Sequence, residues 1–208
     1  MAAYKRKAQT TAGKYQKKAK YMAKPSRAVW ERKGLSSGPT TSVFNTTGGT
    51  AHLTNIDAGL GRDGRIGNRL SVSSIDLKGA FAVNTAGLAA QTCRIFVICD
   101  KYQSDAAFPS VFGANGVLES ASALSLFSLD QPDRFHVLYD QFVVLNKIDK
   151  TTATLNAKIP VPKSLVSSFA TNLGTTISRN GIYLMVIGDV GANAPTITFT
   201  SRISWTDY

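Results

Sequence analysis

Apolar and polar residues alternate with a period of two through most of the chain after residue 34, the pattern of half-buried β-strands. Val, Ile, Thr, Ser and Phe are frequent there, Gly, Pro and Asn interrupt the runs, and no long apolar stripe of helical period is visible. Alternation is cleanest near the carboxyl end, where Ile197, Phe199, Ile203 and Trp205 share one face. The pattern predicts an all-β domain whose last strand is interior and places these four side chains in the core.

The runs between turn signals number eight, which is the strand count of a jelly-roll β-sandwich. We therefore predict an eight-stranded antiparallel jelly-roll β-sandwich. The predicted strands cover residues 42–56, 68–83, 92–100, 134–140, 142–148, 153–161, 181–188 and 196–206.

Two of these runs, Ile95 to Cys99 and Tyr183 to Ile187, are apolar at every position. Strands of that kind are central in a sheet or face a second protein layer. Cys93 and Cys99 lie six residues apart in the same run, so they share a face about 20 Å apart and cannot form a disulfide with each other. Both thiols are predicted to be small buried hydrophobes.

Two connections are long, over residues 101–133 and 162–180. Loops of this length in a compact domain are usually functional. We expect short helices within them at residues 119–127 and 164–173, and contacts at the ends or edges of the sandwich.

Charge divides the chain sharply. Eleven of the 24 basic residues lie in the first 33 positions, where Glu31 is the sole acid, so this segment carries ten of the eleven formal positive charges. Residues 1–33 are thus predicted to be a basic amino-terminal arm and residues 34–208 a nearly neutral shell domain. Length and composition leave room for one folded domain after the arm.

Aromatic residues interleave with the cations of the arm, a composition that follows a phosphate backbone and offers rings for unpaired bases to stack on. Single-stranded nucleic acid is the predicted ligand. The residues predicted to bind it are Lys5, Arg6, Lys7, Lys14, Tyr15, Lys17, Lys18, Lys20, Tyr21, Lys24, Arg27, Trp30, Arg32 and Lys33. A subset also fits a nuclear localisation signal: Lys5, Arg6, Lys7, Lys17, Lys18 and Lys20.

The sequence contains no convincing motif for a nucleotide-binding, catalytic or metal site. Gly59, Gly61 and Gly64 spell GxGxxG, but the segment that follows alternates like a strand and does not open a helix, so the context of a dinucleotide site is missing. His52 and His136 are the sole histidines, and neither has the surroundings of a catalytic base. We expect no enzyme activity, no metal site and no cofactor. Without a long apolar run, we also expect no membrane partner.

Five motifs resemble, in order, the capsid proteins of small circular single-stranded DNA viruses, the circovirus-like and geminivirus-like group. They are the basic arm, GRDGRIGNRLSVSSIDLKGAF at 61–81, CRIFVICD at 93–100, RFHVLYDQFVVL at 134–145, and GIYLMVIGD with PTITFTSRISWTD near the carboxyl end. The arm departs from that group because Lys prevails over Arg, and the zinc-binding Cys and His cluster of geminiviruses is missing.

The resemblance implies a coat protein that assembles with itself into a shell, most simply of 60 copies, with the arms turned inward on a single-stranded DNA genome. It also implies location in the virion and in the host nucleus during assembly, with nuclear import receptors as host partners. Two alternatives stay open: the coat protein of a small satellite-like RNA virus, and a non-viral β-domain that binds single-stranded nucleic acid.

Overall fold

A computed structural model describes residues 32–87, 89–102, 109–113 and 115–207, and all ten of its secondary-structure elements are β-strands. The chain divides into two units, residues 1–30 and residues 31–208, and all the described strands lie in the second. The strands are β1 (Lys33–Val43), β2 (Gly49–His52), β3 (Arg69–Ala82), β4 (Ala90–Asp100), β5 (Phe135–Asn146), β6 (Thr152–Pro160), β7 (Val166–Phe169), β8 (Ile177–Arg179), β9 (Gly181–Gly188) and β10 (Thr196–Asp207).

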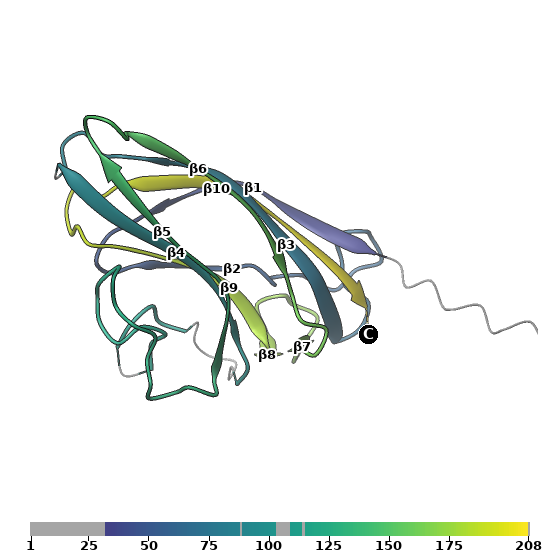
Figure 1. The fold of residues 1–208 in the computed structure, drawn as a ribbon. Helices are drawn as coiled ribbons and strands as arrows, with labels where there is room; N and C mark the ends of the chain where they lie inside the picture. Colours follow the sequence, from purple (N-terminus) through teal and green to yellow (C-terminus); the bar gives the residue numbers. More distant parts are fainter. Residues whose placement is uncertain (1–31, 88, 103–108, 114, 208) are drawn as a thin grey trace, which may run out of the picture. The chain divides into compact units, whose positions relative to one another are not determined.

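The strands form two antiparallel sheets that face each other (Figure 1). Sheet A has the order β1-β10-β3, with β6 pairing along one half of the free edge of β3 and β7, followed by β8, along the other half. Sheet B has the order β2-β9-β4-β5. Without the short pair β7 and β8, the two orders are those of a jelly roll, and the predicted fold class is confirmed.

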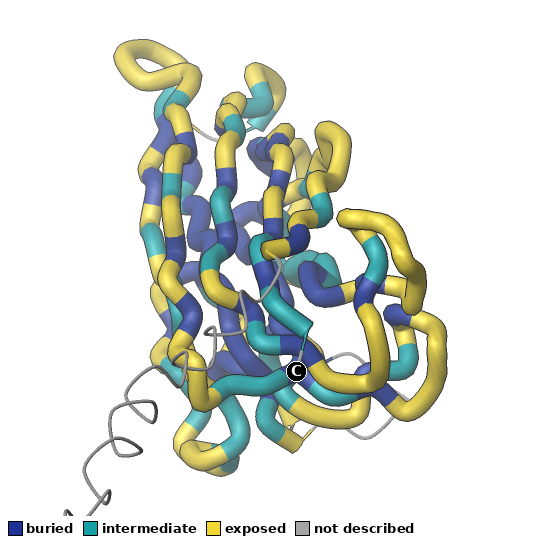
Figure 2. Tube along the Cα trace, turned by 90° about the vertical axis from the view of Figure 1, so that its right-hand side faces the viewer, coloured by how far each residue is buried: buried dark blue, intermediate teal, exposed yellow. Residues whose placement is uncertain are grey.

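Side chains from the inner faces of both sheets fill the core, and the alternation of buried and exposed positions along each strand is visible in Figure 2. Strand β10 shows why: Ile197, Phe199, Ile203 and Trp205 are buried, whereas Thr198 between the first two is exposed. Because β10 pairs with β1 on one side and β3 on the other, it is interior, as predicted.

A second apolar cluster lies on the outer face of sheet B. There Phe96, Ile98 and Met185 pack with Val117 and Leu118 of the long connection between β4 and β5. This explains why β4 and β9 are apolar on both faces, and it confirms that both strands are central and meet a second layer. Cys93 and Cys99 are buried on the inner face and are not disulfide-bonded to each other, as predicted.

The described residues form ten strands: the eight strands of the jelly roll, and the short strands β7 and β8, which were not predicted. At two places the predicted strands are divided differently in the structure. The predicted strand 42–56 is the end of β1 and all of β2, separated by a turn at Gly48, which has a φ of 71°. The predicted strands 134–140 and 142–148 are one strand, β5, whose register against β4 shifts between Val97 and Ile98. The two errors cancel in the count.

Both predicted short helices are wrong, although both segments lie within the described residues. In 119–127, the hydroxyls of Ser122 and Ser125 accept hydrogen bonds from nearby backbone N–H groups, which favours turns over helix. In 164–173, residues 166–169 alternate in burial and pair with the start of β3 as strand β7.

Candidate nucleic-acid interface

Twelve of the fourteen predicted nucleic-acid-binding residues lie outside the described residues, as does the predicted nuclear localisation signal. The other two residues behave differently from each other. Arg32 is exposed and lines a hollow on the outer face of sheet A together with Ser73, Lys158 and Ser204.

Lys33 is the first residue of β1, and its side chain is only 2% exposed. Its Nζ lies 3.0 Å from Oδ2 of Asp207 and donates a hydrogen bond to the carbonyl oxygen of Gly64 at 2.9 Å. Because its ammonium is buried and already paired within the protein, Lys33 is not available to bind nucleic acid.

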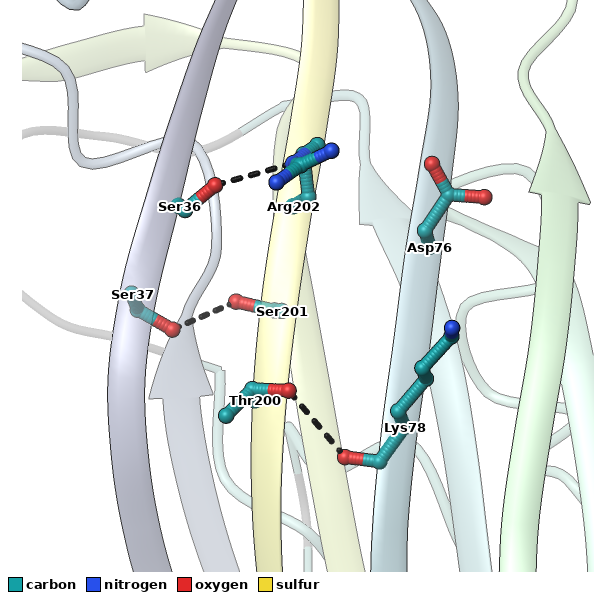
Figure 3. Close-up of a pocket in the computed structure, with 7 residues that line it drawn as sticks. All are labelled: Ser36, Ser37, Asp76, Lys78, Thr200, Ser201 and Arg202. Carbon is teal, nitrogen blue, oxygen red and sulfur yellow. Dashed lines mark hydrogen bonds between the residues drawn. The ribbon is translucent and has the colours of Figure 1, made fainter.

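The outer face of sheet A is polar and shallowly hollowed (Figure 3). In the hollow, Nε of Arg202 on β10 donates to the hydroxyl of Ser36 on β1 at 2.9 Å. The register places Arg202 directly opposite Asp76 of β3, and Asp76 directly opposite Lys158 of β6. Lys78 of β3 is exposed beside them. A row of polar side chains, Ser36, Arg202, Asp76 and Lys158, thus crosses four strands.

Charge is divided between the two sides of the sandwich. The exposed charged residues on the strands of sheet A are cations, with Asp76 half-buried among them: Arg69, Lys78, Lys158, Arg179 and Arg202. On the sheet B side, the exposed charged residues between 109 and 146 are the acids Glu119, Asp130, Asp133 and Asp140. The nearly neutral total charge of the body therefore hides a basic face, which composition alone did not reveal.

Three further arginines are structural. Arg65 is fully buried, its guanidinium lies 4.0 Å from the ring centre of Phe169, and it donates to the carbonyl oxygens of Ile56, Gly67 and Thr171. It fastens the turn that contains Gly59, Gly61 and Gly64 to the segment after β7. The residues that follow this turn enter β3, so the GxGxxG spacing here belongs to a strand connection.

Arg94 and Arg134 hold the long connection 101–133 against sheet B. Arg94 makes a two-bond salt bridge with Asp140, at 2.8 and 2.7 Å, and donates to the carbonyl oxygens of Ala123 and Ser125. Arg134 makes the same kind of pair with buried Asp100, at 2.9 and 2.8 Å, and this hydrogen bonding raises the pKa of Arg134.

Burial favours the uncharged forms of His52, Cys93 and Cys99. Burial lowers the pKa of His52 to about 4, its Nε2 lies 3.0 Å from the hydroxyl of Thr54, and its ring stacks on Tyr183. Burial raises the pKa of both Cys93 and Cys99 to about 12, so neither thiol ionises readily. Among the described residues, no group of three or more His, Cys, Asp or Glu side chains could hold a metal ion.

In the described ranges, no helix is long and apolar enough to cross a membrane.

Comparison with known proteins gives little. No protein-family model matches the chain, and no curated protein matches it. Among solved structures, one of Desmodium yellow mottle tymovirus is similar over 85% of this chain and 89% of its own, with 9% identity and a TM-score of 0.33. A structure of infectious bursal disease virus, Gx strain, is similar over 86% of this chain and 32% of its own, with 13% identity and a TM-score of 0.32. At these TM-scores, neither likeness carries an argument about function.

Proposed function

We propose that this protein is a viral capsid protein that assembles with itself into a small icosahedral shell and packages a single-stranded DNA genome through its basic amino-terminal arm. The observation that carries the proposal is the joining of two features in one chain: a jelly-roll body of nearly neutral charge, and a segment of 33 residues that holds ten net positive charges. A neutral body lets copies pack side by side without repulsion, while the arms neutralise a polyanion.

Exposed apolar side chains on the body support self-assembly. Leu124, Leu126 and Leu129 of the long connection are each more than 70% exposed, and Phe142 and Val144 of edge strand β5 are about half exposed. Apolar side chains gathered on one side of a body are typical of surfaces that another protein covers. A second copy of the chain is the partner we assign to them.

The charge of the arm suits a small genome. A shell of 60 copies would bring about 600 positive charges inside, a partial match to a genome of roughly one to two thousand phosphates, with counterions neutralising the rest. The clusters around Lys5 to Lys7 and Lys17 to Lys20 would first take the protein into the host nucleus, where we expect import receptors to bind them.

The test is to purify the full chain and image it by negative-stain electron microscopy, then extract the nucleic acid and digest it with DNase or RNase. We expect uniform closed particles and DNase-sensitive single strands. Particles that contain only RNase-sensitive strands would assign the chain to the coat proteins of RNA viruses instead. A monomer or small oligomer at all salt concentrations would overturn the capsid proposal.

A further inference from the structure

A cleft of about 510 Å³ is lined by residues from the start of β3, from the segment that contains β7 and β8, and from the residues just after β4. Its size is within the range of small-ligand sites. Among the described residues that line it, four are cations and none is a carboxylate. The residues that line it are Arg69, Lys101, Tyr102, Lys163, Ser164, Leu165, Val166, Ser168, Arg179 and Asn180.

Strand register brings two of the cations to one face. Arg69 of β3 is directly opposite Ser168 of β7, which is directly opposite Arg179 of β8. Directly paired residues in antiparallel strands point to the same side of a sheet, so the two guanidiniums flank the Ser168 hydroxyl with their Cα atoms about 10 Å apart. Phe169, the next residue of β7, is buried, as is Ile177, its partner on β8 beyond a shift in register.

The wall of the cleft is held in place by the backbone beside Arg179. Asn180 adopts a left-handed conformation with a φ of 55°, its side-chain amide donates to the carbonyl oxygen of Val166 at 2.7 Å, and its own carbonyl accepts from the hydroxyl of buried Ser167 at 2.8 Å. These bonds fix the turn between β8 and β9. Arg179 is therefore presented from a rigid edge.

Lys101, Lys163 and Arg179 are like charges that repel each other, and the described residues that line the cleft include no carboxylate. An anion that reaches several of them at once removes that repulsion and gains charge-assisted hydrogen bonds. Tyr102 adds a ring that is 61% exposed, and Ser164 and Ser168 add hydroxyl donors. Cations, hydroxyls and an open aromatic face are together the requirements of a phosphate backbone with an unpaired base.

We propose that this cleft binds single-stranded nucleic acid, with backbone phosphates between Lys163, Arg179 and Arg69 and a base against Tyr102. The choice of nucleic acid over another polyanion rests on the proposed function. It is favoured by the sheet itself, because Arg69 and Arg179 of the cleft lie on strands of sheet A, as do the exposed cations Lys78, Lys158 and Arg202. The genome would thus contact the body as well as the arm.

The test uses the full chain in three forms: wild type, the double variant Lys163→Gln with Arg179→Gln, and the matched control Lys147→Gln with Lys150→Gln. All four positions are exposed, and both variants remove two positive charges. Each protein is stripped of nucleic acid at high salt and mixed with a fluorescent oligothymidylate before the salt is lowered. The affinity is then measured against salt concentration by fluorescence anisotropy.

We expect the slope of log affinity against log salt to become shallower by about 1.4 in the cleft variant, from about 0.7 per lost phosphate contact, and to stay near the wild-type value in the control. Ultraviolet cross-linking of wild type should label the peptide that contains Tyr102. Equal slopes in the two variants, or cross-links that avoid Tyr102, would overturn the proposal.

Heparin is the competitor that tests the ligand class. If heparin binding depends on Lys163 and Arg179 while oligothymidylate binding does not, the cleft is a sulfated-glycan site and the proposal is wrong. Electron microscopy of the same samples separates this result from the proposed function. If the cleft variant forms particles and its salt slope equals that of wild type, only the proposal for the cleft is wrong. If its salt slope changes but no protein forms particles, only the capsid proposal is wrong.

Discussion

Lys33 and Asp207 join the first and last strands of sheet A: Nζ of Lys33 lies 3.0 Å from Oδ2 of Asp207, and the lysine side chain is 2% exposed. The other carboxylate oxygen of Asp207 accepts a hydrogen bond from the backbone N–H of Ile66 at 3.0 Å. One carboxylate therefore connects the end of β10, the start of β1 and the turn before β3.

Replacing Asp207 with Asn should lower the free energy of unfolding by about 2 kcal/mol, because it leaves the buried Lys33 ammonium without its counter-charge. Urea denaturation measures the change. Asp149→Asn, at an exposed turn, is the control and should stay within about 0.5 kcal/mol of wild type. A loss equal to that of the control would mean that the ion pair contributes nothing to stability.

Phe199→Ala should lower the free energy of unfolding by about 3 to 5 kcal/mol and abolish soluble particles, because the Phe199 ring is 3% exposed in the interior strand β10. Thr198→Ala, one residue away on the exposed face, should change it by no more than about 0.5 kcal/mol. Thermal unfolding and particle yield of the two variants report the difference. A more sensitive Thr198 would contradict the register of β10.

Stability should depend on His52 between pH 6.5 and about 4. Burial lowers the pKa of His52 to about 4 from its ordinary value of 6.5, so in this window the unfolded chain binds a proton that the folded chain does not. The free energy of unfolding therefore falls as the pH falls, by about 1.4 kcal/mol per pH unit from this group, and its share of the loss is complete near pH 4.

His52→Gln removes this proton linkage and should flatten the dependence of the urea midpoint on pH. His136→Gln is the control, because it changes an exposed ring on β5 and leaves the buried ring in place. If His136→Gln flattens the profile and His52→Gln does not, the assignment to His52 is wrong.

Removal of residues 1–30 should leave a body that still forms shells but no longer copurifies with nucleic acid, because the described part of sheet A begins at Lys33. Removal of residues 1–33 should instead give less stable protein, since it deletes the Lys33 ammonium that Asp207 holds. Absorbance at 260 and 280 nm and electron microscopy measure both results. Insoluble protein from the shorter deletion would contradict the independence of the body.

The arm itself should bind by charge and not by base identity, because a lysine ammonium does not present the planar two-bond geometry that reads base edges. Competition between unrelated single strands should therefore show less than about a tenfold preference. Its log affinity should fall against log salt with a slope no steeper than about −7, from ten net charges at about 0.7 each. A strong preference for one sequence would contradict this binding mode.

The strands that are buried on one or both faces were predictable from sequence. Strands β3, β9 and β10 have bounds within two residues of those predicted, because burial on one or both faces fixes their composition. Strand β1 was missed for the opposite reason. It is an edge strand rich in Ser, Thr, Gly and Pro, in which Lys33 is the one buried residue, and an edge tolerates Gly38 and Pro39 at its irregularity.

The basic face was not predictable, because it depends on which strands become neighbours. Arg69 and Arg179 are 110 positions apart in the chain, and sequence gives no sign that β7 will bring them to one cleft. Nor did the sequence show that Arg65, Arg94 and Arg134 are tied to backbone and carboxylate oxygens. Because these three arginines are held by contacts within the body, the exposed cations on its strands lie on sheet A.

The division of charge between a basic sheet A and an acidic sheet B side gives the body an electric dipole moment. A body with almost no net charge feels only a weak overall pull toward a polyanion, but opposite charges on its two sides produce a torque. Each copy of the body would therefore rotate as it approaches the nucleic acid, so that its basic sheet A faces the polyanion before contact is made. Orientation around the genome would then be set during approach, and the contacts between neighbouring copies would have only to preserve it.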